Sequence, residues 1–393
     1  MRRFGAFIIG LFLVAAFFRV DFFFYILYLL FGIFFFAQIW TNRALRAVHC
    51  AREYSDRAFL GDKVAVTLHV RNDGVLPLPW LSVHESLPIQ LKSPNFFHCV
   101  TSLLPREEKI FQYELDCRRR GYYLLGPLFL NAGDLFGLRV NQKRVPTRDV
   151  LLVYPQVVPL TELGLPAQTP FGEIPTTRHI FEDPARMMGV REYRVGDSIR
   201  HIHWKTTAAT GTLQVKRFEP AISVEAQIFL DLDRRAYTQG RVNLASELAI
   251  VAAASIANYL VEKRQKVGVS CNGFDPMAAQ EQIIELPPAR GRDQLMRVMD
   301  ILARVQLGEK IPFSEVLGQA SYHLSWGGTG IIIAPHADDS LFETMLLMKR
   351  SGFHVVLILV DPQEPFARLQ RRAHEVGIRA YQLWQEKDLD MWR

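Results

Sequence analysis

One polar stretch, Arg191 to Phe218, concentrates the residues that could bind or react. It is rich in Arg, Lys and His, contains aromatic residues, and has only two carboxylates, Glu192 and Asp197. Such a composition indicates either a binding surface or a clasp between two structural units. If the segment after Asp197 is extended, His201 and His203 share one face and could chelate zinc with a third ligand. Spacing alone names no third ligand, so we expect a packed or hydrogen-bonded histidine pair.

The rest of the sequence lacks the common catalytic signatures, because it contains no Walker loop, HExxH or Gly-x-Ser-x-Gly motif. The 4 cysteines have no CxxC spacing, which favours reduced, buried thiols. We therefore expect no enzymatic activity and no cofactor. Two alternatives stay open. One is a metal-dependent hydrolase that uses His201, His203 and Asp231, and the other is nucleic-acid binding by the basic stretch. Nucleic acid is not the expected partner, since the only other dense basic run is Arg118 to Arg120.

Turn and strand patterns position the polar stretch. Val195 to Ser198 has turn chemistry, because Gly tolerates positive φ and Asp can bond its own backbone. If the segment after Asp197 is extended, Arg200, Ile202 and Trp204 share the face opposite the two histidines. Leu213 and Val215 alternate with polar residues, as a half-buried strand should. The segment Thr206 to Gly211 fits either a turn or a single helical turn.

The motif in this stretch resembles the DUF58 family of bacterial membrane-anchored proteins. The matching residues are Arg191, Glu192, Tyr193, Gly196, Asp197, Arg200, Ile202, Trp204, Lys205, Ala208, Gly211 and Leu213. His203 stands where that family often has Asp, and Ala209 stands where it often has Arg.

The resemblance implies a partnership and a fold. Proteins of this family are typically encoded beside MoxR-type AAA+ ATPases, carry a von Willebrand factor A-like domain at the C-terminus, and are thought to help assemble or activate other complexes. We expect a scaffold or adaptor that contacts that ATPase and other membrane or cytosolic proteins. The residues expected to form the contact or clasp are Arg191, Arg194, Asp197, Arg200, Trp204 and Lys205.

The resemblance also implies where a metal ion would bind. In von Willebrand factor A-like domains (A-like domains), an Asp-x-Ser-x-Ser loop after the first strand holds the ion. Here Asp231 keeps the first position, Asp233 replaces one hydroxyl and Arg235 the other. A guanidinium repels a divalent cation at close range. We therefore expect Asp231 to pair with Arg234 or Arg235, and the weak metal candidates are Asp231, Asp233, His201 and His203.

The first part of the chain predicts a membrane anchor. Residues 4–18 and 22–40 are apolar runs that form a transmembrane hairpin within a first domain of residues 1–43. Basic residues precede and follow the pair, so both termini should be cytoplasmic, at a bacterial inner membrane. The formal net charge of +6 also favours the phospholipid surface of the bilayer. Residues 44–56 are polar and should continue the second helix out of the membrane.

Beyond the anchor, three further regions follow. Residues 57–154 show period-two alternation and Pro-rich turns, which predicts an Ig-like β-sandwich. Residues 155–220 are a connector followed by the DUF58 motif. Residues 221–393 alternate strands and helices, with strands near 224–232, 267–271, 330–334, 355–360 and 379–383, and Asn243 as a helix N-cap. This alternation predicts a doubly wound α/β sheet, which the resemblance narrows to an A-like domain.

Overall fold

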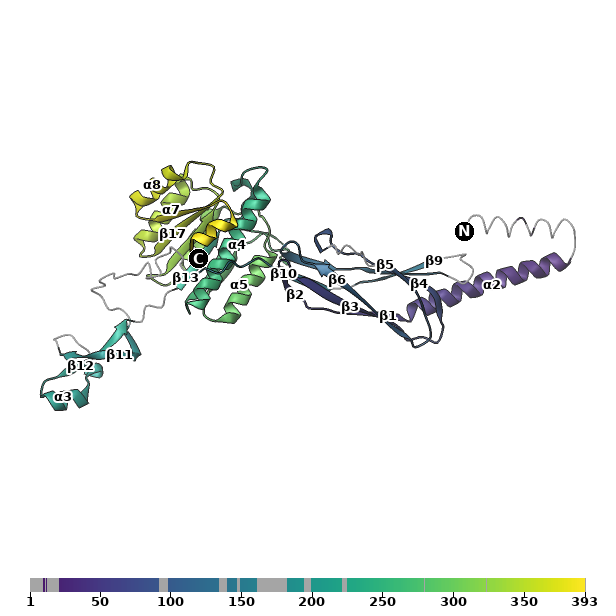
Figure 1. The fold of residues 1–393 in the computed structure, drawn as a ribbon, viewed down its shortest axis with the longest axis horizontal. Coiled ribbons are helices and arrows are strands. Elements are labelled where there is room, and N and C mark those ends of the chain that lie inside the picture. The colour runs from purple at the N-terminus through teal and green to yellow at the C-terminus, as the bar shows by residue number, and fades with distance from the viewer. Residues whose placement is uncertain are drawn as a thin grey trace. The chain divides into compact units, whose positions relative to one another are not determined.

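The structure is a computed structural model, and it describes residues 10, 12, 21–91, 98–133, 140–146, 149–160, 182–193, 199–220, 225–278, 280–322 and 324–392. The chain divides into two compact units (Figure 1). The first comprises Met1–Gln156 and Met299–Val305, and the second comprises Val157–Val298 and Gln306–Arg393. The expected first membrane span, residues 4–18, lies outside the described residues except for positions 10 and 12.

The second apolar run forms helix α2, Asp21–Arg46, which is long and apolar enough to cross a membrane. Its C-terminal turns enter the β-rich part of the first unit, where Ala44 and Leu45 belong to the core. The indole Nε1 of Trp40 donates a hydrogen bond to the carbonyl oxygen of Pro77 at 3.0 Å. The prediction that this helix continues through residue 56 is wrong. The chain leaves the helix after Arg46, because the following residues pair in a sheet.

The β-rich part of the first unit contains three antiparallel or mixed sheets, with strand orders β1-β3-β6, β2-β10-β7 and β5-β4-β8-β9. Their burial alternates along the strands, as in β3, and buried residues of the different sheets form one hydrophobic core. The elements are β1 (Val48–Glu53), β2 (Arg57–Phe59), β3 (Lys63–Asn72), β4 (Leu78–Glu85), η1 (Ile89–Leu91), β5 (His98–Leu103), β6 (Glu108–Asp116), β7 (Gly121–Leu125), β8 (Leu128–Gly133), β9 (Val140–Val145) and β10 (Asp149–Tyr154).

A buried charged cluster crosses this core. Arg52 pairs with Glu85 and with Asp149, and the hydroxyl of Tyr113 donates to Glu85. The side chains of Arg52 and Glu85 are 1% and 0% exposed. Burial raises the pKa of the Glu85 carboxyl, although Arg52 opposes this shift. Losing either partner would leave the other charge buried and unpaired, which is strongly destabilising.

The second unit contains a doubly wound α/β sheet of 6 strands in the order β15-β14-β13-β16-β17-β18. All neighbours pair in parallel except β14 and β15. The strands are β13 (Glu225–Leu230), β14 (Lys266–Cys271), β15 (Ile284–Ala289), β16 (Thr329–Ala334), β17 (His354–Val360) and β18 (Arg379–Leu383). The helices are η3 (Arg234–Ala236), α4 (Val242–Glu262), α5 (Arg292–Arg304), α6 (Phe313–Ser321), α7 (Asp339–Arg350), α8 (Phe366–Val376) and η4 (Glu386–Trp392). The end of α5, from Met299 onward, is grouped with the first unit.

This sheet confirms the expected doubly wound α/β class and corrects two details. No strand was predicted at β15, because its Pro287-Pro288 pair is typical of turns. The strand tolerates the pair because it lies at the edge of the sheet. Asn243 is not the N-cap of α4, because that position is Arg241, which makes no side-chain capping bond. Helix α4 also has the composition of a membrane span, but 78% of its apolar window is buried, as in the core helix of a soluble domain.

Candidate functional site

The DUF58 motif lies on a hairpin formed by β11 (Glu182–Glu192) and β12 (Gln214–Pro220). The strands pair antiparallel, with Arg191 opposite Val215 and Glu192 opposite Gln214. Between them lie η2 (Ile199–His201) and α3 (Trp204–Thr210). Residues 182–188, which were expected in the connector, belong to a strand. The segment from Arg200 to Trp204 is mainly helical, so the condition of an extended segment is not met.

His203 is a structural residue in this hairpin. It is the N-cap of α3, and its Nδ1 accepts hydrogen bonds from the backbone N–H and the hydroxyl of Thr206, at 3.1 and 2.7 Å. A side chain that accepts from the first turn satisfies a donor that the helix itself leaves unpaired. Asp is a preferred N-cap, so His203 fills the role that Asp would fill at the same position of the motif. Gly211 ends the helix in the left-handed region, with φ of 71°.

The motif residues divide into those that hold the hairpin together and those that it displays. Ile202 and Val215 form a bridge and are 6% and 4% exposed. By contrast, Trp204 is 66% exposed and Ile199 is 70% exposed. Lys205 is also exposed. The cap at His203 and the bridge from Ile202 to Val215 hold α3 in place. An exposed indole next to a lysine on such a helix is typical of a contact surface.

The remaining described residues of the motif begin at the end of β11. Arg191 and Glu192 are exposed at the end of β11, and the Arg191 Nη1 donates to the Glu192 carbonyl at 3.0 Å. Tyr193 follows the strand, and its backbone N–H donates to Leu213 at 2.8 Å. Arg194, Gly196 and Asp197 lie outside the described residues, and the backbone of Arg200 is described without its side chain.

A second group of polar residues lies at the carboxyl ends of β13 and β16. These strands are neighbours, but the chain continues from them toward opposite edges of the sheet, so their ends form the topological switch point where doubly wound domains bind ligands. Asp231 follows β13 and is 3% exposed. Its Oδ1 accepts from the Asn272 Nδ2 at 2.9 Å and from the backbone N–H of Asp233 at 3.0 Å. Burial raises its pKa to about 6, although these hydrogen bonds favour the charged form.

At the carboxyl end of β13, Asp233 and not Asp231 forms the ion pair with Arg235. Arg235 donates to both carboxylate oxygens of Asp233, at distances of 2.7 to 3.2 Å, and Asp233 also caps η3. Burial would raise the pKa of Asp233, but the hydrogen bonds from Arg235 outweigh it and lower the pKa. The expected ion pair of Asp231 with Arg234 or Arg235 is therefore wrong. Arg234 lies 3.9 Å from Glu309 instead.

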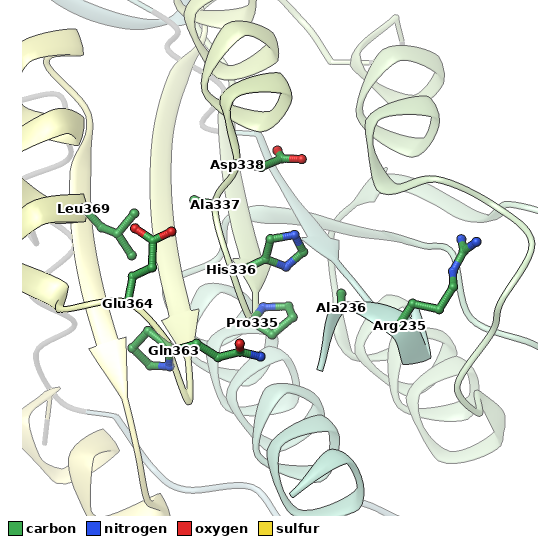
Figure 2. Close-up of a pocket in the computed structure, with 10 residues that line it drawn as sticks. Arg235, Ala236, Pro335, His336, Ala337, Asp338, Gln363, Glu364 and Leu369 are labelled. Atoms are coloured by element: carbon green, nitrogen blue, oxygen red, sulfur yellow. The ribbon is translucent and has the colours of Figure 1, made fainter. Parts of the chain in front are cut away.

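A cavity of about 270 Å³ opens beside these residues. In Figure 2, Arg235 and Glu364 lie on opposite sides of His336 in this view. The cavity lining comprises Arg235, Ala236, Pro335, His336, Ala337, Asp338, Pro362, Gln363, Glu364 and Leu369. Asp338 accepts from the backbone N–H of Leu341 and caps α7. This lining mixes both charge signs and suits a polar group better than an apolar one.

The described residues contain no group of three His, Cys, Asp or Glu side chains that could hold a metal ion. His201, His203 and Asp231 are thus not brought together, and the Nδ1 of His203 is already used as a cap. Asn272 and His336, which approach Asp231 from the ends of β14 and β16, were not among the residues predicted from the sequence. Their positions directly after apolar strands were the available signal.

The family described as "Protein of unknown function DUF58" matches residues 189–325. The resemblance to DUF58 is confirmed. The matched segment begins within β11 and contains the rest of the hairpin, Asp231 and the strands β13, β14 and β15. The Bacillus subtilis "Uncharacterized protein YeaD" is 25% identical over 203 residues, which is 48% of this chain and 48% of that protein. The match therefore spans about half the length of that relative.

Two solved structures show limited likeness to parts of the chain. A von Willebrand factor type A protein from Catenulispora acidiphila is 11% identical, with a TM-score of 0.31, over 46% of this chain and 42% of that one. The CARDB domain of a Pyrococcus furiosus protein is 18% identical, with a TM-score of 0.19, over 27% of this chain and 86% of that one. The fold class therefore rests on the strand order and pairing described above.

Proposed function

We propose that this chain is a membrane-anchored adaptor that binds other proteins through the DUF58 hairpin. In this proposal the β-rich part is an Ig-like sandwich, and the α/β unit is an A-like domain. The anchor is a two-span hairpin in a bacterial inner membrane with both termini in the cytoplasm. The partner is a MoxR-type AAA+ ATPase, and the complex serves the assembly or activation of other proteins.

The single observation that carries the proposal is the exposure of Trp204. A tryptophan that stabilises the fold is normally buried, because removing its large apolar surface from water is favourable. Here the indole is 66% exposed, while Ile202 and Val215 of the same hairpin are nearly inaccessible. Trp and Arg dominate many binding surfaces, since each combines a large area with directional bonds. Protein binding also gives a role to the positive charge of the hairpin, whose described residues include no group that could hold a metal ion.

Membrane anchoring is supported by α2, whose apolar window is only 11% buried. Phe22, Tyr25, Tyr28 and Phe31 are each more than half exposed. An apolar helix of this length with a bare aromatic surface would be unfavourable in water and favourable in a bilayer.

The partnership is tested by capture of a MoxR-type ATPase, using the full-length protein in detergent. We expect Trp204→Ala to reduce capture strongly, because truncation of a central aromatic contact commonly costs about 2 kcal/mol or more, roughly thirtyfold in affinity. Trp326→Ala is the matched control, since Trp326 is also 66% exposed but lies outside the motif. Lys205→Ala and Lys310→Ala form a second pair of exposed lysines.

Equal capture by the Trp204 and Trp326 variants would exclude the hairpin from the interface. No capture by the wild-type chain under any nucleotide condition would refute the ATPase partnership itself. Circular dichroism of each variant confirms that a loss of binding does not come from unfolding.

A further inference from the structure

The length of α2 that is free of the β-rich part is too short to cross a bilayer unaided. Among the described residues from Phe22 to Phe36 none is buried, and the first buried residue along the helix is Ala37. From Asp21 to Phe36 the helix measures about 24 Å at 1.5 Å per residue, whereas a hydrocarbon core is about 30 Å thick. A charged residue such as Asp21 marks the far edge of the span. The near edge then falls at about Thr41, within the part of α2 that already packs on the sheets through Trp40 and Ala44.

The loops beside this part of α2 must therefore lie at the level of the lipid headgroups. The β3–β4 loop runs along the helix, because Asp73 donates its backbone N–H to the Ala47 carbonyl and Pro77 accepts from Trp40. Val75 lies between these two contacts and is 74% exposed. The interfacial layer adds roughly 5–7 Å on each side of the hydrocarbon, which corresponds to about four further helical residues.

A buried asparagine fixes a second apolar tip beside the first. Asn72 is 0% exposed, and its Nδ2 donates to the carbonyl oxygens of Leu76 at 2.9 Å and Leu104 at 3.1 Å. It thereby joins the β3–β4 loop to the β5–β6 loop. Leu104 is 60% exposed at the tip of that loop. Two apolar side chains held outward by a buried polar residue fit an interfacial layer better than water.

The charges around these tips favour anionic lipid. Arg43 and Arg46 on α2 and Arg106 in the β5–β6 loop are exposed, and none of them forms an ion pair with another described residue. The neighbouring acidic groups are occupied. Asp73 pairs with Arg71 and His49, and the carboxylate of Glu107 accepts from the backbone N–H of Leu104.

The helix is also attached rigidly enough to hold the loops at this depth. Lys143 on β9 donates to the carbonyl oxygens of Arg46 at 3.0 Å and Val48 at 2.7 Å, and lies 3.4 Å from that of Leu45. It satisfies carbonyl groups that the end of α2 leaves unpaired. No flexible linker separates α2 from the sheets, because β1 begins at Val48, two residues after the helix ends.

We propose that this end of the β-rich part sits in the headgroup layer of an anionic phospholipid bilayer. Val75 and Leu104 insert at the boundary with the acyl chains, and Arg43, Arg46 and Arg106 contact lipid phosphates. This inference rests on the proposed membrane anchoring. It adds a second, peripheral contact to the anchor and fixes the β-rich part against the membrane surface.

The test places an environment-sensitive fluorophore on the full-length protein in lipid nanodiscs. The background carries Cys50→Ser and Cys99→Ser, the two half-buried thiols, and the label is attached through Val75→Cys. Lys63→Cys is the control, because Lys63 begins β3 at the end opposite Asn72. We expect a blue-shifted emission and several-fold stronger quenching by nitroxide-labelled lipid at position 75 than at position 63.

Equal, water-like emission and equal quenching at the two positions in protein that has entered the discs would overturn the inference. Failure of the protein to enter nanodiscs at all would instead refute the membrane anchor. Discs of phosphatidylglycerol should give stronger quenching at position 75 than discs of phosphatidylcholine. The combined Arg43→Gln, Arg46→Gln and Arg106→Gln variant should remove that difference, and equal quenching of the wild type in both lipids would refute the anionic contact.

Discussion

Replacing Asp231 by Asn should stabilise the α/β unit at neutral pH and remove part of its pH dependence. Asp231 is 3% exposed, and burial raises the pKa of its carboxyl group to about 6 from a usual value of 3.8. In the unfolded chain the same group titrates near its usual value. Between these two values the folded state therefore binds a proton that the unfolded chain has released.

Stability falls as pH rises wherever the folded state binds more protons than the unfolded state. For Asp231 this window runs from about pH 4 to about pH 6, and the cost stays constant above it. A shift of about two units corresponds to roughly 3 kcal/mol, at about 1.4 kcal/mol per unit. Asn avoids the cost of a buried charge, and its side-chain oxygen can still accept from Asn272 and from the backbone of Asp233.

Cys271 offers a local readout of this effect. It is 0% exposed, and it ends β14, where it pairs with Leu230 of β13. A disulfide reagent that reacts at acid pH labels it when the unit opens, and mass spectrometry separates it from the other cysteines. Comparing Asp231→Asn with wild type at the same pH cancels the chemistry of the reagent. We expect labelling of the variant to be roughly a hundredfold slower at pH 7, by the conversion of 1.4 kcal/mol per tenfold, and nearly equal at pH 4.

Asp233→Asn is the control with the opposite sign. The hydrogen bonds from Arg235 outweigh burial and lower the pKa of Asp233, so its contribution to stability is present at neutral pH and is lost as pH falls through the folded value. That variant should be labelled faster than wild type at pH 7, and the two should converge in acid. A ratio of Asp231→Asn to wild type that stays constant from pH 4 to pH 7 would refute the buried, proton-binding carboxyl.

Substitutions at four further positions test the packing at the end of α2, in the hairpin and in the α/β sheet. Lys143→Met removes the donor to the end of α2 and should lower stability by about 1–3 kcal/mol in a thermal melt in detergent, with partial rescue by Lys143→Arg. His203→Ala should cost α3 about 1 kcal/mol and raise hydrogen exchange over the helix, whereas His203→Asp should not. Gly268→Ala should destabilise by about 1–3 kcal/mol in urea, because its Cβ would lie 2.1 Å from the Gln227 Oε1 and 2.4 Å from a backbone oxygen. Gly318→Ala meets nothing within 4 Å and should stabilise α6 by up to about 1 kcal/mol; the opposite order for the two glycines would contradict the packing.

Hydrophobic periodicity correctly predicted the strands in which the pattern of apolar residues alone determines which faces are buried. The alternation along β3 and the apolar runs of β13, β16 and β17 correspond to strands, because each buries the faces that its pattern makes apolar. The pattern failed where a partner decides the structure. In β15, Pro287 and Pro288 are tolerated because the strand lies at an edge of the sheet, and no local signal specifies that position.

The candidate sites were predictable as segments but not as arrangements. The motif indicated where the hairpin would be, yet an extended reading of Arg200 to Trp204 placed the histidines on one face, whereas His203 caps a helix. At the carboxyl end of β13, two arginines, Arg234 and Arg235, lie close to Asp231 in the sequence, and either could have been its partner. The backbone turn after β13 instead directs Arg235 onto Asp233 and leaves Asp231 to Asn272, which lies 41 residues further along the chain. Such a pairing depends on which strands are neighbours, and strand order is a tertiary property.

The DUF58 motif therefore combines two physical roles that a sequence pattern cannot separate. Ile202 and His203 hold the hairpin in shape, so substitutions there would disturb any function through folding. Trp204 and Lys205 are exposed and contribute little to that shape, so a substitution there tests binding directly. A loss of partner capture confined to the exposed pair would assign the motif to recognition. An equal loss from both pairs, accompanied by faster hydrogen exchange over α3, would assign it to the stability of the hairpin.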